Sequence, residues 1–172
     1  MVVLRQFKME LKEKLEAIRY VLTDCDGVLT DGGVYYGETG EVLKKFNIKD
    51  GMGVERLRQL IQVPTGIITG ERSPSVIQRA EKLQISELHL GIKDKESCIK
   101  GIMQKHDLQK EQIAYICDDI NDLPVLPFVG VFFCPADALN QVKLKADVVL
   151  TQKGGDACFR EMAEMIILAK SS

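Results

Sequence analysis

Asp24 and Asp26 lie two positions apart, directly after a short run of apolar and β-branched residues, and Gly27 follows them at once. A carboxylate at the end of a buried strand can attack a phosphoryl group as a nucleophile. A second carboxylate can protonate the leaving alkoxide and later take a proton from the attacking water. Asp and Gly are also common in turns, so a turn explains this motif equally well when it is taken alone.

A second acidic cluster, formed by Asp118, Asp119 and Asp122, follows the apolar run at 113–116. Carboxylates that converge at a strand end repel one another, and a divalent cation is the natural compensating charge. Mg²⁺ prefers oxygen ligands and binds through one or two carboxylates together with a substrate phosphate. A solvated acidic helix start is the alternative, because Asp in a first turn complements the helix dipole. With Asp24 expected nearby, we favour a Mg²⁺ site.

Thr69 and Lys95 lie between these two acidic motifs in the chain. Thr69 ends an apolar run, so we expect its hydroxyl at the same sheet edge, within reach of a phosphate oxygen. Lys95 begins an expected helix, where its charge would offset that of the phosphoryl oxygens and of Asp24. Taken singly, each has an ordinary explanation, as a strand end and as one of 23 basic residues. Their order relative to the two acidic motifs favours the catalytic interpretation.

Short apolar runs alternate with segments of helical periodicity along the whole chain. The expected strands cover 20–23, 63–68, 88–90, 113–116, 130–133 and 147–150. The expected helices cover 9–19, 52–61, 75–83, 95–106, 123–128 and 155–170. This alternation predicts an α/β fold of the Rossmann-like type, with a parallel sheet and helices on both faces. Ligands of such sheets bind beyond the carboxyl ends of the strands, where both acidic motifs are expected.

One segment interrupts the alternation. Residues 32–46 contain two strand-like runs around a polar turn bounded by glycines, and we interpret them as a β-hairpin inserted directly after the first strand. No linker, low-complexity tract or internal repeat divides the chain. Residues 1–172 are therefore expected to form a single domain that carries this insertion.

The composition is that of an ordinary globular protein, since 45% of the 172 residues are hydrophobic and 28% are charged. The net charge of −2 is spread along the chain and leaves no electrostatic footprint for nucleic acid. No apolar run is long enough to span a bilayer, and the first residues lack a signal-peptide core. We therefore expect a cytoplasmic protein with no nucleic-acid or membrane partner. The five scattered cysteines are interpreted as reduced thiols.

In their order and spacing, the segments around Asp24, Thr69, Lys95 and Asp118 resemble the four motifs of the haloacid dehalogenase superfamily of phosphohydrolases. The resemblance implies that Asp24 is the nucleophile, which carries the phosphoryl group as an aspartyl phosphate. It implies that Asp26 is the general acid and base. Thr69 and Lys95 would hold the transferred phosphoryl group.

The same resemblance implies a set of ligands for Mg²⁺. Asp24, Asp118 and the backbone carbonyl of Asp26 would bind the metal directly. Asp119 and Asp122 would support the metal shell from further out.

Within the superfamily, the chain resembles the capless 3-deoxy-D-manno-octulosonate (KDO) 8-phosphate phosphatases and their relatives that act on nine-carbon keto acids. The resemblance extends from about residue 19 to 169 and rests on the short length, the motif at 26–32, the hairpin and the tail at 154–161. It implies a small-molecule sugar acid phosphate as substrate, with KDO 8-phosphate favoured, and a place in lipopolysaccharide synthesis. It also implies a homotetramer assembled through the hairpins, in which a neighbouring subunit helps to exclude water from each active site.

Two positions depart from the octulosonate phosphatases, which usually have glycine in place of Cys117 and arginine in place of Glu71. Together with Arg79 and Lys82, Glu71 resembles the relatives that dephosphorylate nonulosonate (KDN or N-acylneuraminate) 9-phosphates. A cation would pair with the substrate carboxylate, and Glu71 would accept hydrogen bonds from sugar hydroxyls. The alternative is a helix start with a solvated charged face. The substrate-binding candidates are thus Gly70, Glu71, Arg79 and Lys82.

Two hypotheses from other classes compete with an enzyme. A phospho-aspartyl signalling module also uses acidic residues, a threonine and a lysine on a parallel sheet, but its acceptor aspartate follows a middle strand. Here the paired acidic motif opens the fold. A non-catalytic oligomerisation domain is the second rival, and it has no physical need for so costly a cluster of carboxylates.

Overall fold

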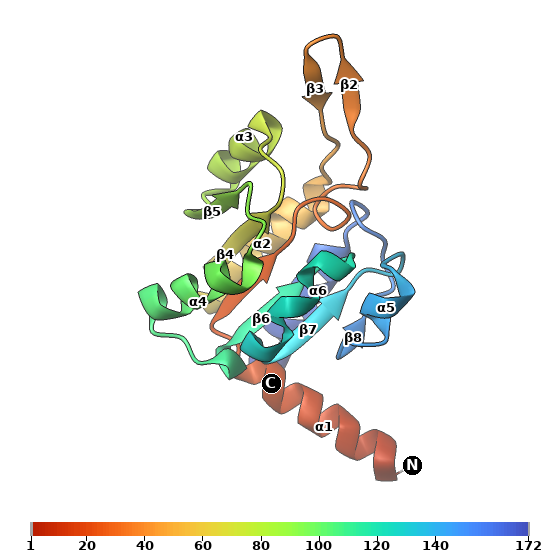
Figure 1. The fold of residues 1–172 in the computed structure, drawn as a ribbon. Helices are drawn as coiled ribbons and strands as arrows, with labels where there is room; N and C mark the ends of the chain where they lie inside the picture. Colours follow the sequence, from red (N-terminus) through yellow and green to blue (C-terminus); the bar gives the residue numbers. More distant parts are fainter. Residues whose placement is uncertain (1, 172) are drawn as a thin grey trace.

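A six-stranded parallel sheet forms the centre of the protein in its computed structural model, which describes residues 2–171 and the side chains of residues 9–171. The strand order is β5-β4-β1-β6-β7-β8, so the first strand lies in the middle (Figure 1). The strands are β1 (Tyr20–Thr23), β4 (Thr65–Thr69), β5 (Glu87–Leu90), β6 (Ile113–Ile116), β7 (Val131–Cys134) and β8 (Val148–Val149). The predicted α/β class and the parallel sheet are confirmed.

Side chains that alternate along each central strand supply two separate cores, one on each face of the sheet. In β1, Val21 joins the core that contains Phe159 and Met162, whereas Leu22 joins the core that contains Ile99 and Tyr115. This alternation follows from the pleat of the strand, which points successive side chains to opposite faces. The helices are α1 (Val2–Glu16), α2 (Ile48–Ile61), α3 (Pro74–Leu83), α4 (Lys95–His106), α5 (Asn140–Lys143) and α6 (Cys158–Lys170).

Helix α2 packs against α6 beneath one face of the sheet, and α4 packs with a 3₁₀ segment, η2 (Ile120–Phe128), over the other (Figure 1). A second short 3₁₀ turn, η1 (Lys110–Gln112), leads into β6. Both faces are therefore covered, as the near-continuous apolar strands require. The arrangement leaves the carboxyl edge of the sheet as the place where polar groups can gather.

Several predicted boundaries differ from the structure. The helix predicted at 123–128 is a 3₁₀ helix, because Pro124 and Pro127 lack the N–H groups of a regular α-helix. The helix predicted from 155 begins at Cys158, since Gly155 and Ala157 adopt positive φ angles of 64° and 74°. Helix α5 was not predicted at all, because four residues give too short a pattern.

Helix α2 begins four residues earlier than predicted. Asn47 caps its start, since the side-chain oxygen accepts a hydrogen bond from the Lys49 N–H at 2.9 Å. Helix propensity does not predict this earlier start, because residues 51 and 53 are glycines and glycine is a poor helix former.

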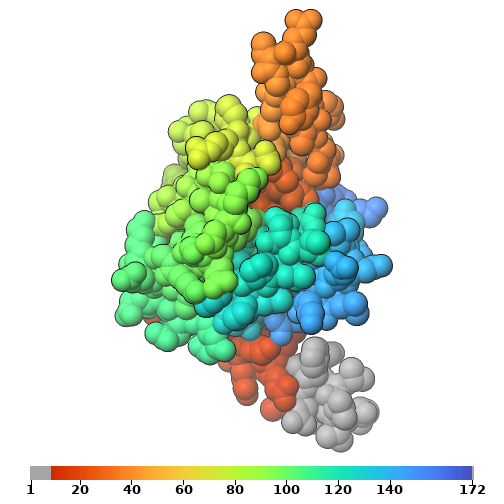
Figure 2. Space-filling model, viewed as in Figure 1, coloured from red at the N-terminus to blue at the C-terminus, as the bar shows by residue number. Residues whose placement is uncertain are grey.

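The predicted hairpin is present as β2 (Tyr35–Gly37) and β3 (Gly40–Leu43), which pair in antiparallel fashion apart from the main sheet. A bridge between Thr30 and Phe46 closes its base. The hairpin projects from the body of the protein beyond the carboxyl edge of the sheet (Figures 1 and 2). Its apolar side chains are left exposed, most of all Tyr36 at 75%.

None of the helices among residues 2–171 combines the length and the apolar character needed to cross a lipid bilayer.

Candidate active site

The predicted catalytic residues meet at the carboxyl ends of three adjacent strands. Asp24 follows β1, Thr69 ends β4, and Asp118 follows β6, and β1 pairs with both of the other strands. A cleft of about 310 Å³ opens at this edge. Seven of the predicted residues line it, namely Asp24, Asp26, Thr69, Gly70, Glu71, Asp118 and Asp119.

Asp24 is almost fully buried, with 6% of its surface exposed. Its Oδ1 accepts a hydrogen bond from the Cys25 N–H at 2.7 Å and lies 3.1 Å from Lys95 Nζ. Burial raises the pKa of Asp24 to about 7, and the negative charge of Asp122 adds to the rise, while Lys95 opposes it. The carboxylate is therefore held in one position with its charge only partly compensated by the protein.

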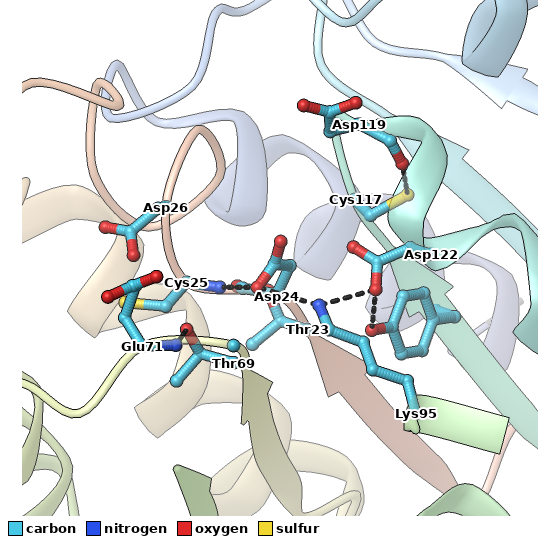
Figure 3. Close-up of polar contacts among 12 residues, drawn as sticks. Thr23, Asp24, Cys25, Asp26, Thr69, Glu71, Lys95, Cys117, Asp119 and Asp122 are labelled. Carbon is cyan, nitrogen blue, oxygen red and sulfur yellow. Dashed lines mark hydrogen bonds and ion pairs between the residues drawn. The ribbon is translucent and has the colours of Figure 1, made fainter. Parts of the chain in front are cut away.

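Lys95 lies between two carboxylates, since its Nζ is 2.5 Å from Asp122 Oδ1 as well as 3.1 Å from Asp24 (Figure 3). Asp94 caps the start of α4, where Lys95 is the first helical residue, by accepting the Ser97 N–H at 3.0 Å. Tyr115 donates its hydroxyl to Asp122 Oδ1 at 3.1 Å from within the core. Asp122, which is fully buried, therefore orients Lys95 from behind and does not border the cleft.

Asp118 depends on Gly27 for its position. A Cβ atom on Gly27 would lie 1.9 Å from Asp118 Oδ2, and the φ of Gly27 is +76°, a conformation that other residues rarely adopt. The pKa of Asp118 is raised to about 7, by burial first and by the charge of Asp24 second. The loop after β1 thus leaves a cradle in which the Asp118 carboxylate faces the same cleft as Asp24.

Asp26 is held by a different cation. Lys44 Nζ lies 2.6 Å and 2.7 Å from the two carboxylate oxygens of Asp26, and the Thr30 hydroxyl donates to Oδ1 at 3.2 Å. Lys44 follows strand β3 of the hairpin, so the partner of Asp26 comes from the insertion rather than from the sheet.

Thr69 is buried, and its side-chain oxygen accepts the Glu71 N–H at 3.2 Å. Its hydroxyl hydrogen remains available to a ligand in the cleft. This contact also orders the loop that follows β4 and carries the exposed Glu71 into the rim of the cleft (Figure 3).

The other two predicted substrate-binding residues lie apart from the cleft of this chain. Arg79 donates to the Asn47 carbonyl at 2.8 Å and lies over the ring of Phe46, 5.6 Å from its centroid. Lys82 is exposed on α3. Of the nonulosonate-type triplet, only Glu71 borders the site within one chain.

A divalent cation fits the carboxylates that face the cleft. Asp24, which is buried, and Asp118, which is half-buried, each have a pKa raised to about 7, first by desolvation and then by a neighbouring carboxylate, Asp122 for Asp24 and Asp24 for Asp118. Within the described residues, no group of three or more His, Cys, Asp or Glu side chains is arranged to hold a metal ion. Mg²⁺ needs no such group, because it keeps several waters and uses one or two protein carboxylates.

Sequence reasoning missed several residues that build the site. Lys44 is adjacent to Lys45 in a polar hairpin, so its sequence context predicts a solvent-exposed charge. Asp50 is buried and accepts the N–H groups of Ala157 and Arg160 at 3.3 and 3.0 Å, which anchors the loop before α6. Asn47 donates to the Gly155 carbonyl at 3.2 Å. The only sequence signal for Asn47 and Asp50 is their position just before a helical pattern. That position indicates a helix N-cap and not a contact with the loop before α6.

No family model matches the chain. It is 39% identical over 160 residues to the 3-deoxy-D-manno-octulosonate 8-phosphate phosphatase KdsC of Haemophilus influenzae, covering 93% of this chain and 88% of the relative.

Solved structures agree with this sequence match. One is the 3-deoxy-D-manno-octulosonate 8-phosphate phosphatase of Moraxella catarrhalis in complex with magnesium, phosphate and KDO, with a TM-score of 0.89, 32% identity and coverage of 94% of this chain and 92% of that one. Another is a Legionella pneumophila hydrolase assigned to the HAD superfamily, subfamily III A, with a TM-score of 0.94, 32% identity and coverage of 99% and 93%.

The cradle around Asp118 predicts a specific effect of Gly27→Ala. The left-handed backbone at this position should cost roughly 1–2 kcal/mol of the free energy of unfolding when a Cβ is added, and the clash should displace Asp118. Gly32→Ala is the matched control, because Gly32 has a similar φ of +74° and no atom closer than 3.8 Å to an added Cβ.

Urea unfolding with and without Mg²⁺ measures both effects. We expect the two variants to lose similar stability without the metal, and only Gly27→Ala to lose the stabilisation that Mg²⁺ adds. Equal stabilisation of both variants by Mg²⁺ would show that Asp118 does not depend on this contact.

Proposed function

Because the chain belongs to the KDO 8-phosphate phosphatase family of the haloacid dehalogenase superfamily, we propose that it is a Mg²⁺-dependent phosphatase that hydrolyses KDO 8-phosphate. The observation that carries the proposal is the meeting of Asp24, Lys95 and Asp118 at one strand edge, in a chain 39% identical to such an enzyme. The reaction would release KDO, a precursor of lipopolysaccharide, in the cytoplasm.

Asp24 is the nucleophile in this proposal. One of its oxygens bonds to phosphorus, the bond from phosphorus to the sugar oxygen breaks, and an aspartyl phosphate remains on the enzyme. Lys95 and the Thr69 hydroxyl hold the phosphoryl oxygens and offset their charge. Since Lys95 is itself fixed by Asp122 at 2.5 Å, its position costs no reorganisation when substrate binds.

Asp26 is the general acid and base in this proposal. It gives a proton to the sugar oxygen as the first bond breaks, and it then takes a proton from the water that attacks the aspartyl phosphate. This restores Asp24 and releases inorganic phosphate. The carboxylate of Asp26 lines the cleft, where both the leaving oxygen and the water must lie.

Asp24, Asp118 and the backbone carbonyl of Asp26 would hold Mg²⁺, with Asp119 in support. When bound, the metal supplies positive charge that offsets the two carboxylates and the phosphoryl oxygens. On binding, such a cation would lower the pKa values of Asp24 and Asp118, which are raised to about 7 without it.

A nonulosonate 9-phosphate of the sialic-acid type is the second candidate substrate. The observation in its favour is Glu71, which lines the cleft at the position where octulosonate phosphatases usually have arginine. A carboxylate at the rim would accept hydrogen bonds from the hydroxyls of a longer sugar chain.

Phosphate release from the two sugar acid phosphates, measured side by side with Mg²⁺ and with EDTA, tests the function. We expect turnover only with Mg²⁺ and a higher kcat/KM for KDO 8-phosphate. Asp24→Asn is the control, because it keeps the shape of the side chain and removes the nucleophile. A preference for the nine-carbon substrate would favour the second candidate, and turnover by Asp24→Asn would exclude Asp24 as nucleophile.

The raised carboxyl pKa values predict how stability depends on pH and Mg²⁺. Without metal, the pKa of Asp24 and of Asp118 is raised to about 7 in the folded state, whereas the ordinary pKa of an aspartate in the unfolded chain is about 3.8. The folded state therefore binds more protons than the unfolded state between these values, and stability falls as the pH rises through this window.

Mg²⁺ binds the deprotonated groups, so protons compete with it at low pH. We expect Mg²⁺ to raise the melting temperature more at pH 8 than at pH 5.5 in thermal unfolding experiments. Asp118→Asn is expected to lose most of this metal-dependent shift. An identical shift at both pH values would mean that these carboxylates do not hold the metal.

We also propose that the chain assembles as a homotetramer through its hairpins. The support is the exposed apolar surface on and beside the hairpin, where Tyr35, Tyr36, Val42 and Ile48 are exposed by 56%, 75%, 58% and 80%. Exposed apolar surface of this kind is typical of an interaction site. A neighbouring subunit over the cleft would exclude water from a site that has no cap domain.

Light scattering after size exclusion measures the mass. We expect four times the 19.2 kDa of the chain, and a smaller mass for the double variant Tyr36→Glu/Val42→Glu, which places charge in the hairpin surface. A wild-type mass of one chain at micromolar concentration would refute the tetramer.

A further inference from the structure

Lys44 is a buried cation to which the reaction outlined above assigns no role. Its side chain is only 1% exposed, so water hardly reaches the ammonium. The charge is instead paired with two carboxylates, those of Asp26 and Glu41. The ammonium lies 2.6 Å and 2.7 Å from the two oxygens of Asp26, and 3.6 Å from Glu41 Oε2. A buried charge is costly unless it is paired, so this contact is a defined part of the structure rather than a passing surface pair.

The contact fixes the orientation of Asp26. Both carboxylate oxygens of Asp26 face the same ammonium, and the Thr30 hydroxyl adds a third hydrogen bond at 3.2 Å. Three bonds from two side chains leave the carboxylate little rotational freedom. A general acid and base has to reach the leaving oxygen and the attacking water within a fraction of an ångström, because small displacements lower the rate strongly.

Lys44 also connects Asp26 to the hairpin. It follows β3 directly, and Glu41, which lies within β3, accepts a hydrogen bond from the Ser73 hydroxyl. Ser73 is the residue that precedes helix α3, and its hydroxyl makes no cap bond to that helix. The chain of contacts therefore joins the catalytic loop, the hairpin and the start of α3.

We propose that Lys44 is a positioning residue, which orients the carboxylate of Asp26 for both proton transfers. The orientation of Asp26 then depends on how the hairpin is placed relative to the sheet. The inference rests on the proposed function, since it requires Asp26 to be the general acid and base. It adds to that function a physical route by which the hairpin reaches the reaction centre.

Lys44→Met tests the inference, because methionine keeps the apolar stem and removes the ammonium. With p-nitrophenyl phosphate as substrate, we expect kcat to fall roughly 100-fold while kcat/KM changes little, because only the hydrolysis of the phosphoenzyme is slowed and KM falls together with kcat. Lys45→Met is the matched control, since Lys45 is the next residue, is 61% exposed and pairs with Asp31 rather than with Asp26. Lys44→Arg should restore part of the rate.

The fate of the phosphoenzyme separates a positioning role from a general loss of structure. p-Nitrophenolate leaves without a proton, so Lys44→Met should still form the aspartyl phosphate. Its hydrolysis needs Asp26 to accept a proton from water and should be slow. We expect mass spectrometry of the quenched reaction to show accumulated phosphoenzyme in Lys44→Met, and none in the wild type or in Lys45→Met.

A double-mutant cycle with Asp26→Asn completes the experiment. If Lys44 acts through Asp26, the double variant should be no slower than Asp26→Asn alone. The double variant also removes the unpaired carboxylate that would be left in Lys44→Met, which guards against a failure to fold. Additive losses, or a Lys44→Met enzyme as fast as Lys45→Met, would overturn the inference. Absence of wild-type turnover would instead count against the proposed function itself.

Discussion

Lys95 holds two carboxylates in a place that water hardly reaches, with its ammonium 3.1 Å from Asp24 and 2.5 Å from Asp122. Burial of negative charge at the carboxyl edge of the sheet is the constraint to which the rest of the site responds. Asp24 is buried and Asp118 is half-buried, the charge of Asp24 raises the pKa of Asp118, and one lysine cannot neutralise these two acids together with Asp122. The incomplete compensation is what makes the edge a receptor for a divalent cation and a phosphoryl group.

Asp24 and Asp26 receive their cations from different parts of the fold. Lys95 starts a helix that packs on the sheet, and it is held from behind by Asp122 and Tyr115. Lys44 comes from the inserted hairpin and binds Asp26. Asp24 is therefore fixed by a helix that packs on the sheet, whereas Asp26 is fixed by the hairpin that projects from it. Two carboxylates only two residues apart are in this way given different surroundings.

Close backbone contacts support this arrangement from the other side. A Cβ atom on Gly154 would lie 2.0 Å from the carbonyl oxygen of Gly27, so the loop before α6 packs directly against the loop that follows β1. Asn47 and Asp50 tie that same loop to the start of α2 by hydrogen bonds. The position of Gly27, and with it the cradle for Asp118, thus depends on residues more than a hundred positions further along the chain.

The sequence by itself determined the local and the periodic features. Apolar runs and helical spacing predicted the strands, most helices and the hairpin, because burial on a pleat or a helix face leaves a repeating pattern. The position of the motifs at strand ends predicted that Asp24, Thr69 and Asp118 lie at one edge of the sheet. Tertiary structure alone decided which cations Asp26 and Asp122 meet, because the pairs of Asp26 with Lys44 and of Asp122 with Lys95 leave no periodic pattern in the sequence. It also turned Arg79 toward the Asn47 carbonyl and away from the cleft, since a guanidinium on a helix satisfies whichever buried acceptor the packing brings within reach.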